Sequence, residues 1–254
     1  TLFRSPFQLQ QYQKDSRILY KANDKYWGKK PDIDRLVFSI TPDASVRYAK
    51  LQKNECQAMP YPNPADIAKM KQNKDIQLLE QPGLNVGYIS FNVEKKPLDN
   101  QKVRQALEYA VDKEGIAQGI LAGSEKVADT LMARSVPYCD FDSPTYIYQP
   151  EKAASLLEEE GWLLPAGKTV REKQGKPLQL LLSYNVNNAV EKEIAELLQD
   201  DFKKIGVALT VVGEEKQAFL DRQKSGDFDL QYSLSWGTPY DPASFVSSFR
   251  IPAH

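Results

Sequence analysis

Alternating hydrophobic and polar residues at the start of the chain predict β-strands. Residues 7–22 (FQLQQYQKDSRILYKA) alternate in this way on both sides of the polar stretch at 14–16. A period of two residues is typical of strands, so we expect two strands joined by a turn at 14–16. Residues 33–40 (IDRLVFSI) are rich in strand-forming side chains and predict a further strand.

From Asp43 to residue 80 the hydrophobic pattern consists of short segments, some with helical and some with strand spacing. Asp43 precedes apolar residues at helical spacing and is expected to open a helix. We expect a second helix over residues 65–72, with short strands at 56–59 and 76–80 on either side of it.

Residues 85–93 (NVGYISFNV) alternate again and predict a longer strand. The strand follows Pro82 and Gly83, which interrupt the preceding pattern. We interpret it as a hinge between two lobes, with an ordinary central strand as the alternative.

Helix signals dominate the middle of the chain. Asp99 and Asp112 are candidate N-caps of two successive helices. Residues 136–150 are rich in tyrosine, proline and aspartate, lack periodicity, and predict a long irregular loop. Pro150 and Gly161 then mark the first turn and the end of another helix.

The last third of the chain alternates strands with helices, which predicts an α/β fold. The expected elements are a buried strand at 178–184, a helix at 189–205 closed by Gly206, a strand at 207–213, a helix at 214–224 and a strand at 228–236. A strand–helix–strand unit normally pairs its strands in parallel. Trp236 therefore follows the end of a strand, where α/β sheets tend to bind ligands.

Composition identifies a globular chain without a bulk charge. The 254 residues are 41% hydrophobic and 26% charged, with a net charge of −1. This balance gives no global attraction to nucleic acid or anionic lipid. No stretch approaches the roughly 20 apolar residues of a membrane span, and the start lacks a signal-peptide pattern. Cys56 and Cys139 do not have the spacing of a zinc or redox motif.

Candidate chemistry is concentrated in residues 236–254 (WGTPYDPASFVSSFRIPAH). This segment holds Trp236, Tyr240, Arg250 and His254, the only histidine of the chain. Aromatic faces, a cation and an imidazole favour ligand binding. Trp236 and Tyr240 could also be ordinary core aromatics, and His254 a surface histidine at a ragged terminus.

Enzymatic chemistry has little support. The sequence contains no GxSxG, GxxxxGK[ST] or GxGxxG motif, which leaves an α/β hydrolase as a distant alternative. A single imidazole cannot hold a metal alone, so a metal would need ligands from elsewhere, such as a small chelator. We expect neither a catalytic residue nor a catalytic cofactor.

Long stretches of the chain resemble the solute-binding proteins of ABC importers for dipeptides, oligopeptides and nickel. The runs YWGKKPDIDRLVFSITPDASVRYAKLQKNECQAMPYPNPADIAKMKQ and GLNVGYISFNVEKKPLDNQKVRQALEYAV resemble the dipeptide-binding branch. From about Glu125, VADTLMARSVPY, GWLLPAGKTVREKQGKPLQL and the segment 236–254 resemble the nickel-binding branch.

The resemblance implies a bilobal, type II periplasmic-binding-protein-like fold, truncated here, with mixed sheets flanked by helices. Residues 1–84 would be the remaining part of lobe I, and 85–254 an incomplete lobe II. Such proteins clamp a ligand between lobes in the periplasm and deliver it to an ABC permease in the inner membrane. We expect this chain to be a binding protein of that kind and not an enzyme, with no nucleic acid partner.

The resemblance also implies roles for individual residues. Trp236 and Tyr240 would line the cleft, His254 would bind nickel directly, and an arginine such as Arg250 would hold the carboxylates of the chelator. Leu220 stands where the nickel branch has another tyrosine. The expected ligand is therefore a nickel–chelator complex.

Dipeptide binding is the alternative. Peptide binders of the family hold the ligand's amino terminus with an aspartate shortly after this tryptophan, and here that segment reads Gly237, Thr238, Pro239. Residues 1–5 (TLFRS) also depart from the family, and the family implies that Cys56 pairs with a cysteine in an amino-terminal region absent here.

Overall fold

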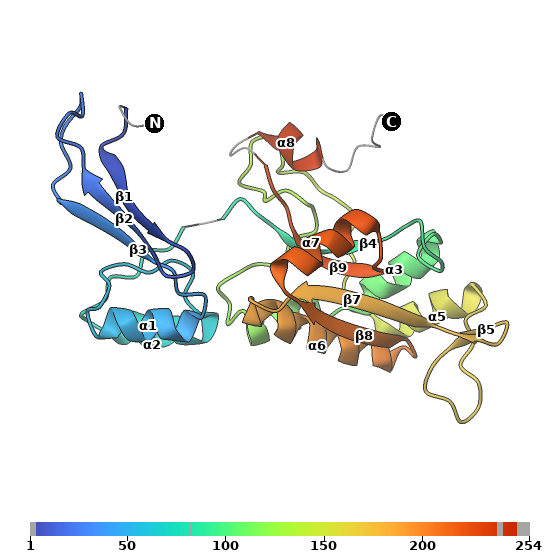
Figure 1. Cartoon of the computed structure of the whole chain (residues 1–254). Coiled ribbons are helices and arrows are strands. Elements are labelled where there is room, and N and C mark those ends of the chain that lie inside the picture. Colours follow the sequence, from blue (N-terminus) through green and yellow to red (C-terminus); the bar gives the residue numbers. More distant parts are fainter. Residues whose placement is uncertain (1–3, 82, 238–240, 248–254) are drawn as a thin grey trace. The chain divides into compact units, whose positions relative to one another are not determined.

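The computed structural model describes residues 4–81, 83–237 and 241–247 (Figure 1). The chain divides into two compact units, Thr1–Asp66 and Ile67–His254.

The first unit is built on a three-stranded antiparallel sheet in the order β1-β2-β3. Its elements are β1 (Phe7–Gln13), β2 (Arg17–Ala22), β3 (Arg35–Ser39), α1 (Ala44–Gln52) and the start of α2 (Pro64–Gln72). The predicted turn between the first two strands is confirmed, with Asp15 at a left-handed φ of 58°. Asp43 caps α1 as predicted, because its Oδ1 accepts a hydrogen bond from the Val46 amide at 2.8 Å.

Burial in this first unit is slight. Asn23 is its only described residue that is buried. The apolar side chains of the sheet are half-buried or exposed, including Phe38 at 52% exposure, whose ring meets that of Tyr20 edge to face. The described residues of this unit therefore have no hydrophobic core of their own.

Two predicted strands are wrong. Residues 56–59 and 76–80 form no strand in the structure. A strand is held by hydrogen bonds to a neighbouring strand, and neither segment pairs with another one among the described residues.

The second unit contains a four-stranded mixed sheet in the order β4-β9-β7-β8. Its strands are β4 (Gly87–Phe91), β7 (Gln179–Asn185), β8 (Ala208–Glu214) and β9 (Leu230–Leu234), with β5 (Glu172–Lys173) and β6 (Lys176–Pro177) forming a separate hairpin. Its helices are α3 (Gln101–Tyr109), α4 (Lys113–Gly115), the π-helical turn η1 (Ile116–Ile120), α5 (Pro150–Glu159), α6 (Ala189–Lys204), α7 (Lys216–Ser225) and α8 (Pro242–Val246).

The predicted strand–helix–strand unit is confirmed by β7, α6 and β8. The two strands run parallel, from the pair Gln179 and Ala208 to the pair Asn185 and Glu214. β9 also runs parallel to β7, whereas β4 pairs antiparallel with β9. Among the described residues β4 is an edge strand of this sheet.

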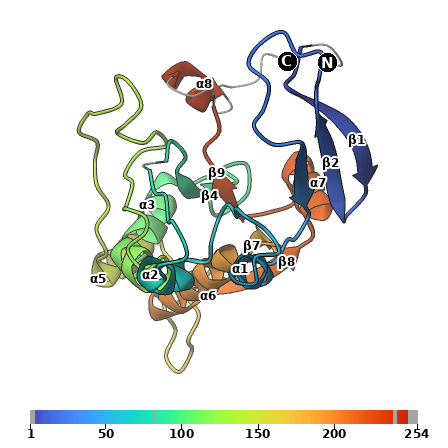
Figure 2. The ribbon, with the colours of Figure 1, turned by 90° about the vertical axis from the view of Figure 1, so that its left-hand side faces the viewer.

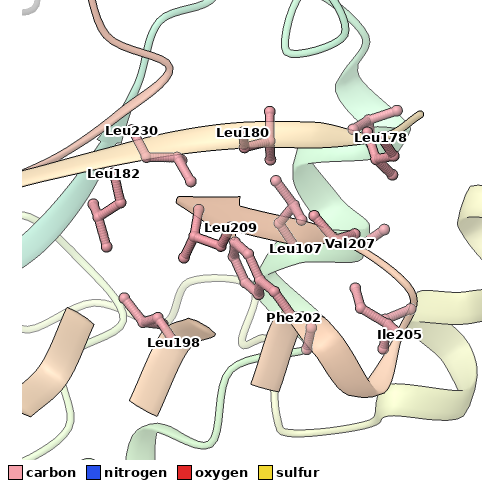
Figure 3. Close-up of a cluster of buried hydrophobic side chains, with 14 of the residues drawn as sticks. Leu107, Leu178, Leu180, Leu182, Leu198, Phe202, Ile205, Val207, Leu209 and Leu230 are labelled. Carbon is pink, nitrogen blue, oxygen red and sulfur yellow. The ribbon is translucent and has the colours of Figure 1, made fainter. Parts of the chain in front are cut away.

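Helices cover both faces of this sheet. α6 lies on one face of β7 and β8 and α7 on the other, as the two views show (Figures 1 and 2). α3 and α5 pack side by side. Leucines of the strands meet the apolar side of α6 in the core shown in Figure 3. The fully buried members include Leu107, Leu157, Leu178, Leu182, Ile205, Val207 and Leu230.

Helix ends follow the sequence signals with one exception. Asp112 caps the second helix, accepting from the Gly115 amide at 2.8 Å, as predicted. Asp99 is not the cap of α3, because Asn100 accepts the amides of Lys102 and Val103 instead. The predicted loop at 136–150 is confirmed up to Pro150, which opens α5.

Gly206 closes α6 as predicted, with a left-handed φ of 78°. The buried Arg171 lies against this turn, and its Nε donates to the Ile205 carbonyl at 2.7 Å. Its Nη1 donates to the Trp162 carbonyl at 2.9 Å and to Glu158 Oε1 at 3.0 Å. One side chain thus joins the ends of two helices.

In the part of the chain that the structure describes, no helix has the length and apolar character needed to cross a membrane.

Candidate ligand-binding site

Trp236 lies just beyond the carboxyl end of β9, with 80% of its surface exposed. The buried Ser235 fixes the backbone beside it. The Ser235 amide donates to the Val86 carbonyl, and the Val86 amide donates to Ser235 Oγ, both at 2.8 Å. Asn85 Nδ2 donates to the Ser235 carbonyl at 2.7 Å. These bonds hold the chain while the indole stays accessible to a ligand.

The remaining predicted site residues lie outside the described part of the chain. They are Tyr240, Arg250 and His254. Of the four, the structure therefore places only Trp236, and it does so next to a pocket.

This pocket lies within the second unit and has a volume of about 630 Å³. Volumes of about 300–1,000 Å³ are typical of small-molecule sites. The described lining residues come from β4, β9 and its flanks, α7, the junction of β7 with α6, and the end of α8: Tyr88, Ser90, Asn185, Glu191, Phe219, Gln223, Phe228, Tyr232, Ser233, Leu234, Ser235, Trp236 and Ser247. Aromatic rings and hydroxyl groups dominate this lining.

Hydroxyl groups of the two paired strands are tied together on one side of the pocket. Ser90 Oγ donates to the Gln231 carbonyl at 3.0 Å and lies 3.3 Å from Ser233 Oγ. Burial raises the pKa of the Tyr88 hydroxyl, and its hydrogen bond with Ser233 partly opposes this effect. The polar groups here are neutral at physiological pH.

Glu191 supplies a carboxylate to the pocket from the first turn of α6, and only 7% of the residue is exposed. Its Oε2 accepts from the Asn185 amide and its Oε1 from Asn188 Nδ2, each at 3.0 Å. Burial raises the pKa of the Glu191 carboxyl, and these two bonds act in the opposite direction. Among the described lining residues Glu191 is the only acid, and none is a lysine, an arginine or a histidine.

Tyr232 shows the effect of this environment. Burial raises the pKa of its hydroxyl to about 12, and the negative charges of Glu191 and Glu125 add to the shift. Its phenol therefore remains neutral through the physiological range. A pocket with aromatic walls and one buried carboxylate is suited to an apolar ligand that carries a positive charge.

The described residues offer no ready-made metal centre, because no group of three or more His, Cys, Asp or Glu side chains comes together among them. The predicted metal ligand, His254, lies outside that part of the chain.

Both cysteines are free among the described residues. Cys139 is buried in a small cluster with Val136 and Phe245, and its Sγ lies 3.5 Å from Met132 Sδ. This packing gives Cys139 a structural role, which the sequence left open. Cys56 is half-buried.

Sequence patterns did not identify Tyr88, Glu191 or Tyr232 as site residues. Each belongs to an ordinary strand or helix pattern, and only the sheet order β4-β9-β7 brings them together. The one available signal was that Tyr232 lies in the same strand pattern as Trp236.

Comparison with known proteins identifies the family. The sequence model of the bacterial extracellular solute-binding proteins, family 5, middle region, matches residues 4–254. The chain is 52% identical over 244 residues to the dipeptide-binding protein of Escherichia coli strain K12, covering 96% of this chain and 44% of that protein. It is 38% identical over 255 residues to the nickel-binding periplasmic protein of the same organism, covering 98% and 48%.

A solved structure agrees with the fold. NikA from Brucella suis in complex with Fe(III)-EDTA superposes with a TM-score of 0.85 and 32% identity, covering 98% of this chain and 51% of that one. The chain spans about half the length of the relatives it matches. The fold is therefore that of type II periplasmic binding proteins, as predicted, with mixed sheets flanked by helices. The family is one of solute-binding proteins, not of enzymes, and this chain belongs to the bacterial extracellular solute-binding proteins of family 5.

Proposed function

We propose that this protein is the substrate-binding component of an ABC importer and captures a short peptide in the periplasm for delivery to the membrane permease. The observation that carries the proposal is the character of the pocket, whose described lining combines aromatic and hydroxyl side chains with the single carboxylate of Glu191. A peptide offers matching groups: a positive amino terminus, apolar side chains and backbone polar groups. The 52% identity with a dipeptide-binding protein supports the same choice.

A nickel chelate, which the sequence favoured, is the second candidate. It is supported by the 38% identity with a nickel-binding protein. In this alternative Trp236 and Tyr240 stack against the chelator, Arg250 holds a chelator carboxylate and His254 binds the metal. A metal chelate with free carboxylates fits the described lining less well, because Glu191 is its one charged side chain and like charges repel.

In both candidates Trp236 supplies an aromatic face to the ligand, and Arg250 is available to a ligand carboxylate. The proposal keeps the assignment of residues 1–84 to lobe I and residues 85–254 to lobe II.

Calorimetric titration distinguishes the two candidates. The protein would be titrated with the dipeptide Ala-Ala and, separately, with Ni²⁺ plus L-histidine. We expect saturable heat with Ala-Ala and none with nickel and histidine. The reverse pattern would replace the peptide by the metal chelate, and heat with neither would reject both.

Replacement of Trp236 tests the site within the same experiment. Trp236→Ala is expected to weaken Ala-Ala binding at least about tenfold, because the ligand loses an aromatic contact surface. Trp27→Ala is the matched control, since Trp27 is 78% exposed and belongs to the other unit. Equal binding by both variants would place the ligand away from Trp236.

A further inference from the structure

Among the described residues no opposite charge compensates for the burial of Glu191. No Lys, Arg or His of the described residues forms a salt bridge with it. Removing a carboxylate from water without a cationic partner is unfavourable unless other groups stabilise it. The two hydrogen bonds from Asn185 and Asn188 provide part of that stabilisation.

Those two bonds leave acceptor capacity on the carboxylate. Each oxygen accepts one hydrogen bond from the described residues. An ionised carboxylate has about four acceptor positions in all, so each oxygen can accept one more. The Asn185 and Asn188 contacts also fix the orientation of the group, because they come from the end of β7 and the N-cap of α6.

Aromatic rings line the same pocket. Tyr88, Phe219, Phe228, Tyr232 and Trp236 all contribute to its surface. The faces of such rings attract cations, and they accept hydrocarbon groups next to the charge. Carboxylate and rings together match one chemical class, an organic ammonium ion with apolar substituents.

We propose that Glu191 is the counter-ion for an ammonium group of the ligand. The inference rests on the proposed function, in which this group is the amino terminus of a peptide. It assigns the recognition of positive charge to the first turn of α6. Gly237, the residue after Trp236 in the sequence, has no ionisable side chain for this role.

The simpler role of Glu191 is to stabilise the start of α6, since it stands three residues after the N-cap Asn188 and accepts a bond from its side chain. Helix stabilisation would affect stability but would not distinguish a charged ligand from a neutral one. The test therefore compares ligands that differ only in charge.

Phenethylammonium and 2-phenylethanol are suitable probes, because they share the aromatic group and differ in the polar end. We expect the protein to bind the ammonium compound at least about tenfold more tightly, a difference of about 1.4 kcal/mol. Glu191→Gln keeps the size and one acceptor oxygen but removes the charge, and it should abolish this preference, so that the two probes bind with similar affinity. Glu191→Asp keeps the charge on a shorter side chain and should retain part of the preference.

Glu193→Gln is the matched control on the same helix, because Glu193 is exposed and does not line the pocket. It should bind both probes as the unmodified protein does. Two results would overturn the inference: no preference for the ammonium compound in the unmodified protein, or a full preference in Glu191→Gln. The first result does not depend on any variant folding.

Titration with Ala-Ala separates this inference from the proposed function. If the ammonium preference depends on Glu191 but Ala-Ala does not bind, the peptide proposal fails and the ammonium site stands. If Ala-Ala binds equally well to the protein and to Glu191→Gln, the peptide proposal stands and Glu191 is not its counter-ion.

Discussion

The hydroxyl of Tyr232 occupies the space in which a side chain at Gly87 would begin. A Cβ atom built on Gly87 would lie 2.5 Å from Tyr232 Oη, a distance that no folded protein tolerates without movement. The two residues come from the paired strands β4 and β9, where Ile89 is the direct partner of Tyr232. The glycine thus allows the phenol to reach its position in the pocket wall.

Gly87→Ala is therefore expected to displace the Tyr232 hydroxyl. Because that hydroxyl is the far end of a side chain that can turn, the loss of stability should lie at the low end of the range for overpacking, about 1 kcal/mol. The pKa of Tyr232 should fall from about 12 toward its ordinary value of 10.0 as the phenol becomes more solvated. Absorbance titration of tyrosine ionisation measures this change. Gly83→Ala is the control, since a Cβ there meets no atom within 4 Å, and a similar shift in it would contradict the proposed contact.

Alkaline pH should destabilise the protein through Tyr232. Its pKa is about 12 in the folded chain against 10.0 ordinarily, so its contribution is present below pH 10 and is lost as pH rises toward 12. For a shift of this size the loss is on the order of 2–3 kcal/mol. Urea unfolding at pH 9 and about pH 11.5 should show a steeper decline for the unmodified protein than for Tyr232→Phe. Parallel declines would mean that Tyr232 titrates normally.

Glu191 should also make the free energy of unfolding fall as pH rises, but in the acidic range. Burial raises its pKa above 4.5, so the folded chain keeps the proton on this carboxyl up to a higher pH than the unfolded chain does. The stabilising contribution is complete below pH 4.5 and is lost as pH rises through the folded-state pKa. The glutamine of the Glu191→Gln variant cannot ionise. The stability of this variant relative to the unmodified protein should therefore increase as pH is raised from 4 to 7. Urea unfolding at both pH values measures the difference. Glu193→Gln, at an exposed position of the same helix, is measured alongside as the reference variant. A stability of Glu191→Gln that falls relative to the unmodified protein between pH 4 and pH 7 would contradict the raised pKa.

Arg171→Met should destabilise the second unit by about 2–4 kcal/mol, because it leaves the buried Ile205 and Trp162 carbonyls without their donor. Thermal or urea unfolding gives the value. Arg134→Met is the control, since Arg134 is exposed and, in the part of the chain that the structure describes, forms a salt bridge with the exposed Asp140. Such a surface pair contributes at most about 1 kcal/mol. Equal losses in the two variants would mean that the Arg171 contacts do not stabilise the fold.

Periodicity predicted most of the second unit, because its elements have clear apolar faces and clear ends. The helix from Ala189 and its closure at Gly206 follow from amphipathic spacing and from the need for a left-handed residue. The short strands at 56–59 and 76–80 could not be judged in the same way. Whether a short apolar segment becomes a strand depends on a pairing partner far along the chain, and local spacing does not report that partner.

The site was predictable only where chemistry was unusual in the sequence itself. Trp236 is identifiable from the sequence because it follows a strand in a segment rich in functional groups. Glu191 is one of many acidic residues on helices, and only its burial beside Asn185 and its place in the lining with Tyr232 distinguish it. Charge recognition in this pocket is a property of tertiary packing.

The uneven distribution of burial between the two units has a consequence for local opening. Amide hydrogens exchange with solvent when the segment that holds them opens, and buried apolar contacts oppose that opening. Amides of α6, β7 and β8, which pack around residues such as Leu182 and Phe202, should therefore exchange most slowly. Those of β1, β2 and β3 should exchange orders of magnitude faster, because the only buried residue described beside them is Asn23. Exchange rates measured along the chain would thus divide it near Asp66 into a slowly opening part and a rapidly opening one.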